Sequence, residues 1–201
     1  LVGAIDLDGY EWKPFSKALI RATEATIPSR IPPRKAIRSG APLEAPHIML
    51  LVNDASDFLV GGAGAAVKAS GSAPLYSGNL MMKGGSIQGR LVPESSEGVL
   101  LSSLEKIAKA NTESDGSVFM FAVGDGNHSL ATAKAVWDEY KQRLGEKERK
   151  TSRVRYALVE IVNIYDAGLT FEPIHRVLFG ADAAELILRL TSQFGGEVSE
   201  C

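Results

Sequence analysis

The chain has 201 residues, of which 45% are hydrophobic and 23% are charged, and its formal net charge is −2. This composition is ordinary for a soluble globular protein, and the near-neutral charge gives no global reason to expect binding to nucleic acid or to a membrane surface. No apolar run is long enough to span a membrane, and the single cysteine, Cys201, excludes a disulfide framework and a cysteine metal cluster.

Both ends of the chain indicate a piece of a longer protein. Residues 1–7 predict a strand and carry neither a methionine nor the basic start of a signal peptide. The last seven residues, GGEVSEC, do not have the pattern of a natural tail. We therefore expect one α+β domain over residues 1–201, taken from a longer chain and located in the cytoplasm.

Residues 12–43 concentrate positive charge around one acidic residue, Glu24. The basic residues of this segment are Lys13, Lys17, Arg21, Arg30, Arg34, Lys35 and Arg38. Such a concentration in a near-neutral chain suggests an anion site, although a charged run is more often a solvated surface. The surrounding cations favour the ionised form of Glu24. This residue is therefore either a structural counter-ion or a base that faces a substrate.

The elements that follow are predicted from apolar runs and turn residues. An extended Pro32-Pro33 leads into a short helix at residues 34–39. A buried strand is expected at residues 46–52, and His47 at its start is interpreted as structural. A second short helix is expected at residues 55–60.

Glycines mark the next part of the chain. The glycine-rich stretch at residues 61–66 lacks the spacing of a dinucleotide-binding loop, so that interpretation is rejected. A short strand at residues 76–82 and the glycines after it predict a hairpin. Residues 97–109 predict a helix with an apolar face made of Leu100, Leu101, Leu104, Ile107 and Ala108.

Residues 119–140, FMFAVGDGNHSLATAKAVWDEY, predict a buried strand, a polar turn and a helix. Asn127 is a candidate N-cap, because its side-chain oxygen can accept from a backbone N–H of the first turn. The apolar face of this helix is expected to contain Leu130, Ala133, Trp137, Tyr140 and Leu144. Free N–H groups and the helix dipole favour anions at such a helix start. We expect the basic segment at residues 12–43 to fold back toward this turn.

The last part of the chain predicts a strand, a turn and a helix. Residues 155–163 form an apolar strand interrupted by Glu160, a carboxylate that would need a partner if buried. A turn at residues 166–168 precedes His175 and Arg176, and residues 183–194 predict an amphipathic helix. Strands and helices mix without strict alternation, so we expect an α+β fold with a mixed sheet and packed helices.

Four segments carry a resemblance to a known family. VGDGNHSLATAKA at residues 123–135 resembles the DGHHR-type motif of a bacterial and archaeal family long catalogued as of unknown function, which is related to free-serine kinases of ParB/sulfiredoxin-like fold. IRATEATIPSR at residues 20–30 resembles the upstream segment of that family, in which a Glu-x-Thr follows a basic residue or a histidine. Residues 79–89 and 156–176 also resemble family sequence. The segments occur in the expected order, and the resemblance extends over most of residues 1–179.

The resemblance implies a ParB/sulfiredoxin-like core and phosphoryl transfer from ATP or ADP to a small hydroxyl compound, with Mg²⁺. It makes Glu24, Asp125 and His128 candidate catalytic residues, with Asp125 also a metal ligand. Phosphate and cofactor contacts would come from Arg21, Arg30, Gly126, Asn127, Ser129 and Arg176. One position departs from the motif, because Ser129 stands where the family has an arginine. A serine hydroxyl cannot make the planar, bidentate phosphate contact of a guanidinium.

The sequence also fits other functions. A non-catalytic nucleotide-binding or anion-binding protein of the same fold would fit the loss of the motif arginine at Ser129. A metal-dependent hydrolase using Asp125, His128 and His175 is weaker, because no histidine pair has helical ligand spacing. Nucleic-acid binding is disfavoured, because the basic segment lacks interleaved aromatic residues. We expect a nucleotide and a small-molecule substrate as ligands, and no membrane partner. The sequence predicts no oligomeric state.

Overall fold

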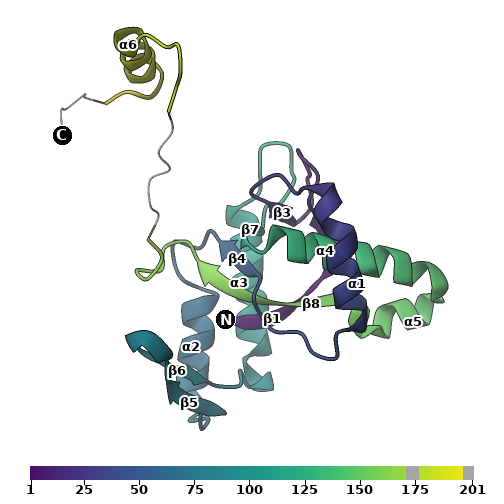
Figure 1. Ribbon diagram of the computed structural model, residues 1–201. Helices are drawn as coiled ribbons and strands as arrows, with labels where there is room; N and C mark the ends of the chain where they lie inside the picture. The colour runs from purple at the N-terminus through teal and green to yellow at the C-terminus, as the bar shows by residue number, and fades with distance from the viewer. Residues whose placement is uncertain (171–176, 197–201) are drawn as a thin grey trace. The chain divides into compact units, whose positions relative to one another are not determined.

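The structure is a computed structural model that describes residues 1–170 and 177–196. The chain divides into two compact units, Leu1–Leu169 and Thr170–Cys201. A single domain over residues 1–201, which the sequence predicts, stays a prediction. The first unit contains the sheets and the candidate site, and the second contains one described helix (Figure 1).

A mixed six-stranded sheet organises the first unit (Figure 1). Its order is β1-β8-β4-β7-β3-β2. The strands are β1 (Val2–Asp6), β2 (Tyr10–Glu11), β3 (Ile20–Ala22), β4 (Met49–Val52), β7 (Phe121–Asp125) and β8 (Tyr156–Asn163). The three apolar runs predicted as strands, now β4, β7 and β8, lie in this one sheet. The expected α+β fold with a mixed sheet is therefore confirmed.

The sheet combines parallel and antiparallel pairs. β7 pairs antiparallel with β4 and parallel with β3, and β8 pairs parallel with β4 and antiparallel with β1. In the β3–β7 pair, Ala22 lies opposite Val123. Because these two strands run in the same direction, the segments that follow them leave the sheet at the same edge.

Six α-helices occur in the part of the chain that the structure describes: α1 (Ile31–Gly40), α2 (Val60–Ala69), α3 (Glu97–Ala110), α4 (Asn127–Tyr140), α5 (Glu146–Thr151) and α6 (Ala183–Phe194). In the first unit, α1 packs beside α4, and α2 packs beside α3 (Figure 1). An ion pair between Lys35 and Glu139 joins α1 to α4.

The hydrophobic core forms where α4 meets the sheet. Leu130, Ala133 and Trp137 of α4 are buried, as predicted, together with Leu50 and Val123 of the central strands. Burial of a large aromatic side chain removes much apolar surface from water and dominates the energetics of such a contact.

A polar contact fixes the orientation of Trp137 in this core. The Trp137 Nε1 donates to Asp8 Oδ1 at 2.9 Å, and Lys141 Nζ reaches the same oxygen at 2.9 Å. Partial burial of Asp8 opposes ionisation, but these hydrogen bonds and the neighbouring lysines outweigh it, so the pKa of Asp8 lies below its ordinary value.

Two helix starts differ from the prediction. Gly126, with φ +86° and ψ 21°, is the residue before α4, and Asn127 is the first helical residue rather than the N-cap. A glycine takes this left-handed conformation at little cost. Pro32 and Pro33 lie in the first turn of α1 rather than in an extended lead-in. A proline lacks an N–H that would be unpaired at that position.

The prediction of a helix at residues 55–60 is wrong. The helix in this part of the chain is α2, which begins at Val60 and contains the glycine-rich stretch. Two carboxylates explain the late start. Asp54 Oδ2 accepts from Leu59 N at 2.9 Å, and Asp57 Oδ1 accepts from Gly61 N at 3.0 Å. Aspartate side chains that pair with nearby backbone N–H groups favour turns and helix starts.

Three further side chains differ from their predicted environment. Tyr140 was expected inward on α4 but is exposed. Leu101 of α3 is also exposed, whereas Ser103 is buried and donates to Phe58 O at 2.9 Å. Glu160 points to solvent on β8 and needs no buried partner.

The predicted hairpin is a separate two-stranded sheet. It consists of β5 (Tyr76–Asn79) and β6 (Ser86–Gly89), which pair antiparallel. In the second unit, α6 has the predicted bounds, and the Asp182 side chain accepts from Glu185 N at 2.9 Å. The apolar face of α6 contains no buried residue.

Candidate functional site

The segment after β3 lies against the first turn of α4. Thr23 Oγ1 donates to Val123 O at 2.6 Å, next to the last pair of the β3–β7 register. Ile27 N donates to His128 Nε2 at 3.0 Å, and Asn127 Nδ2 donates to Glu24 O at 3.5 Å. The basic segment thus folds back to the Asp125 turn, as predicted. Glu24 itself is exposed.

The turn between β7 and α4 tolerates little change at Gly126. A Cβ atom there would lie 3.2 Å from both Ile48 Cα and Ile48 Cγ1. Asp125 Oδ1 accepts from Gly126 N at 2.7 Å, and the Asp125 side chain is exposed. The carboxylate therefore closes the turn with one oxygen and presents the other to solvent.

Two buried polar atoms at this contact have no hydrogen-bond partner: Asn127 Oδ1 and Thr26 Oγ1. The Asn127 side chain is on a residue only 3% exposed, and Thr26 is 7% exposed. Thr26 lies between Glu24 and Ile27, which both bond to the start of α4. Buried polar atoms without partners are rare, because each costs desolvation energy. An acceptor and a hydroxyl without hydrogen-bond partners thus lie where the two segments meet.

His128 has a defined role in the contact. Its Nε2 accepts the Ile27 N–H, so the neutral ring carries its proton on Nδ1. The backbone oxygen of His128 accepts from Thr132 Oγ1 at 2.6 Å. His128 therefore holds the Glu24 segment in place and leaves Nδ1–H as a donor.

Arg21 is engaged away from the turn. It pairs with Ala122 in the strand register, three residues before Asp125. Its Nη1 donates to Glu113 Oε2 at 2.7 Å, and its guanidinium stacks on Phe119 at 4.6 Å. Hydrogen bonds from Ser117 and from Arg21 lower the pKa of Glu113. These contacts give Arg21 a structural role in this conformation.

The other predicted cations are placed differently. Arg30 is exposed at the start of α1. Arg176, like His175, lies outside the described residues. Ser129 lines an open cavity of about 760 Å³, whose other walls come from α1, from the rest of α4 and from the segments at residues 41–47 and 153–156.

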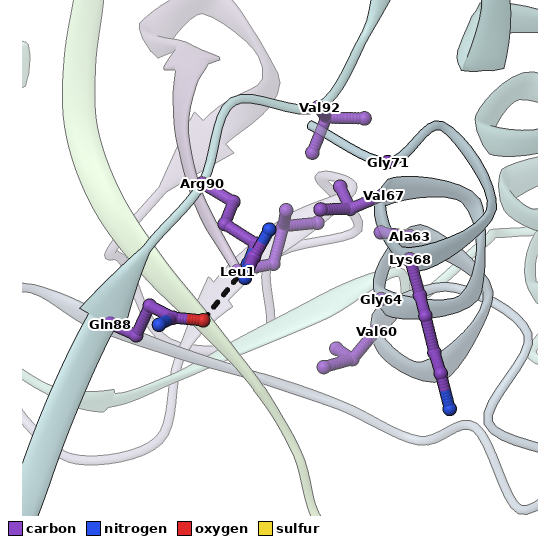
Figure 2. A pocket seen from close by; sticks show the side chains of 10 residues that line it. All are labelled: Leu1, Val60, Ala63, Gly64, Val67, Lys68, Gly71, Gln88, Arg90 and Val92. Carbon is purple, nitrogen blue, oxygen red and sulfur yellow. Dashed lines mark hydrogen bonds between the residues drawn. The ribbon is translucent and has the colours of Figure 1, made fainter. Parts of the chain in front are cut away.

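Two further cavities contain none of the predicted site residues. One, of about 590 Å³, lies between α2 and the β5–β6 hairpin (Figure 2). Its wall on α2 combines apolar Val60, Ala63 and Val67 with Lys68. On the hairpin side, the Gln88 side chain accepts from Arg90 Nε at 2.9 Å. The other, of about 390 Å³, lies beside Phe119.

Asp125 is the one carboxylate predicted as a metal ligand. No group of three or more potential ligand side chains is placed to hold a metal within residues 1–170 and 177–196. Mg²⁺ is often held by one or two carboxylates together with substrate phosphates. Asp125 fits that kind of site, which a nucleotide would complete. Among the described helices, none combines the length and apolar character that a membrane crossing requires.

A comparison with protein families matches residues 1–200 to the family described as "Protein of unknown function (DUF1015)". The chain belongs to the DUF1015 family. The expected membership in a family of unknown function is thereby confirmed. Comparisons of this DUF1015 chain with curated proteins and with solved structures found no match. The DGHHR-type motif, the relation to free-serine kinases and the ParB/sulfiredoxin-like core stay predictions.

Sequence reasoning missed three features of this DUF1015 site. Thr26 is the threonine of the Glu-x-Thr pattern but was not assigned a role, and its burial has no sequence signal. No pattern in the sequence predicts the hydrogen bond from Ile27 N to His128 Nε2. Arg153 faces the cavity beside Ser129, although it follows an ordinary charged helix in the sequence.

Proposed function

We propose that this chain is a nucleotide-dependent phosphotransferase that acts on a small hydroxyl compound, with ATP or ADP as donor and Mg²⁺ as cofactor. The observation that carries the proposal is the position of the Glu24 segment. Asn127 donates to the backbone oxygen of Glu24 and Ile27 N donates to His128, and these two hydrogen bonds hold the segment on the first turn of a 14-residue helix. A carboxylate-bearing segment and an anion-binding helix start are the parts that phosphoryl transfer needs side by side.

Each part has a chemical role in this proposal. The free N–H groups at the start of α4 bind a phosphate oxygen. Asp125 contributes a carboxylate oxygen to Mg²⁺, which would neutralise phosphate charge. Glu24 orients the acceptor hydroxyl and takes its proton as the oxygen attacks phosphorus and the bond to the leaving phosphate breaks.

His128 and the two unpartnered atoms support the acceptor end of the site. His128 is a positioning residue, because its Nε2 holds the segment that carries Glu24. Thr26 Oγ1 and Asn127 Oδ1 are buried and lack partners, so they suit polar groups of a small acceptor. A small amino or hydroxyl compound such as serine has groups of this kind.

A second candidate is a non-catalytic nucleotide-binding or anion-binding protein. The observation in its favour is Ser129, at the position where the resembling motif has an arginine. Loss of one guanidinium weakens stabilisation of the charge on the transferred group more than it weakens ground-state binding. Binding without transfer is the expected behaviour of such a protein.

Calorimetry and a transfer assay distinguish these functions. Wild type, Glu24→Gln and Asp125→Ala are titrated with ATP, ADP and phosphate, with and without Mg²⁺, and assayed with serine and other small hydroxyl compounds. Glu105→Gln on the exposed side of α3 is the control. We expect Glu24→Gln to retain nucleotide binding and to lose transfer by roughly 100-fold or more, the usual contribution of a general base. Asp125→Ala should lose the Mg²⁺-dependent part of binding.

Two outcomes contradict the phosphotransferase. Folded wild-type protein that binds neither nucleotide nor phosphate excludes both candidates. Nucleotide binding with no transfer to any acceptor excludes the enzyme and supports the binding protein.

A further inference from the structure

The cavity beside Ser129 joins the start of α4 to a group of arginines. Ser129, Thr132 and Val136 form its wall on α4. His47 also lines it, and the next residue, Ile48, contacts the Gly126 turn. The cavity therefore reaches the first turn of α4 at Ser129 and continues along the side of this helix.

The cavity is positively charged. Arg34 and Arg38 come from α1, Arg153 comes from the segment before β8, and one carboxylate, Glu44, faces them. Arg38 Nη2 pairs with Glu44 Oε1 at 2.6 Å. Neither Arg34 nor Arg153 has an ion-pair partner among the described residues; Arg34 donates to the backbone oxygen of Arg30 at 3.1 Å. Two guanidinium groups are thus available to an anion.

The cavity also has the size and the apolar surface of a nucleotide site. Its volume of about 760 Å³ falls within the range of small-molecule sites, roughly 300–1,000 Å³. Ile37, Val154 and Tyr156 line it and are exposed, with Ile37 75% accessible. Apolar and aromatic side chains beside cations suit a molecule that is flat at one end and anionic at the other.

We infer that this cavity binds the phosphate chain of the nucleotide and that Arg34 and Arg153 provide the guanidinium charge that Ser129 lacks. The inference rests on the proposed function and assigns its donor site. Arg21, a cation expected from the sequence, is paired with Glu113 instead. An arginine supplied from a neighbouring element restores bidentate phosphate recognition without changing the turn.

Charge reversal tests the cavity directly. Arg153→Glu and Arg34→Glu in the full chain are titrated with pyrophosphate and with ADP. Lys147→Glu on exposed α5 is the control with the same change in charge. We expect both arginine variants to lose affinity for both ligands by at least about tenfold, equivalent to about 1.4 kcal/mol. Lys147→Glu should stay within about twofold of wild type.

A gain of binding tests the same site without removing any contact. Ser129→Arg places a guanidinium on the cavity wall and restores the residue of the resembling motif. We expect about a tenfold gain in pyrophosphate affinity. Urea unfolding of every variant confirms that the protein is folded.

The outcomes separate this inference from the proposed function. If Arg153→Glu, Arg34→Glu and Ser129→Arg all bind pyrophosphate and ADP with wild-type affinity, the cavity does not bind the phosphate chain. That conclusion holds even if Glu24→Gln still abolishes transfer. Arginine-dependent pyrophosphate binding in a protein that transfers no phosphate supports the cavity and contradicts the phosphotransferase.

Discussion

Replacement of Gly126 by alanine tests the geometry of the β7–α4 turn. The residue has φ +86°, and a Cβ atom would lie 3.2 Å from Ile48 Cα. A left-handed conformation costs an L-residue roughly 1–2 kcal/mol. The close contact to backbone adds roughly 1–3 kcal/mol, as for other overpacked sites.

Gly116 provides a control for the conformational part alone. It has φ +84°, nearly the same as Gly126, but nothing lies within 4 Å of the position that a Cβ atom would take there. Both substitutions also restrict the unfolded chain, which offsets roughly 0.4–1 kcal/mol in each case. The difference between Gly126→Ala and Gly116→Ala therefore isolates the contact with Ile48.

Equilibrium unfolding in urea measures this difference. We expect Gly126→Ala to be less stable than Gly116→Ala by about 2 kcal/mol, since the overpacking cost is roughly 1–3 kcal/mol. With a typical urea dependence of about 2 kcal/mol per molar, the two midpoints should differ by about 1 M. Equal midpoints would refute the reasoning, because they would show that Ile48 does not constrain the turn.

Three further substitutions test the core and the predicted cations. Trp137→Ala should lower the free energy of unfolding by roughly 3–5 kcal/mol in urea, because it empties a buried aromatic site; a loss below about 1 kcal/mol would contradict its burial. The pKa of Asp8 is lowered, so its contribution is present above pH 3.8 and is lost as pH falls through the folded-state value. Asp8→Asn should therefore reduce the loss of unfolding free energy that acidification causes, by less than about 1 kcal/mol because the contact is partly exposed. If the dependence of the unfolding free energy on pH is the same as in wild type, the contact with Lys141 does not stabilise the protein. Arg21→Gln should lower the urea midpoint but leave ADP affinity within about twofold of wild type, in accord with its pairing to Glu113; weakened ADP binding would return Arg21 to the site.

The strands were predictable where apolar residues follow one another along the chain. The runs now seen as β4, β7 and β8 are nearly continuous in apolar residues, which predicts that they lie together in one sheet. The late start of α2 was not predictable, because it depends on Asp57, which also accepts from Asn163 Nδ2 at 3.1 Å, 106 residues away. Such tertiary contacts override local helix signals.

The candidate site was predictable in outline only. Its turn follows from glycine and asparagine at the end of an apolar run, and the return of the basic segment was expected from its charge. The choice among cations was not available from the sequence, because it depends on the partner that each arginine meets in the fold. Glu113 pairs with Arg21, whereas Arg153 faces the cavity.

The contact between Ile27 and His128 joins positions 101 residues apart. At about 5–20 residues per second, a ribosome needs about 5–20 s to add that length of chain. During that interval the basic segment cannot take its place in the sheet, because β7, the strand that pairs with β3, has not yet been synthesised. The two halves of the candidate site therefore meet only after β7 and the start of α4 have been synthesised, and a chain that stops before residue 121 can carry Glu24 and still have no helix start to receive it.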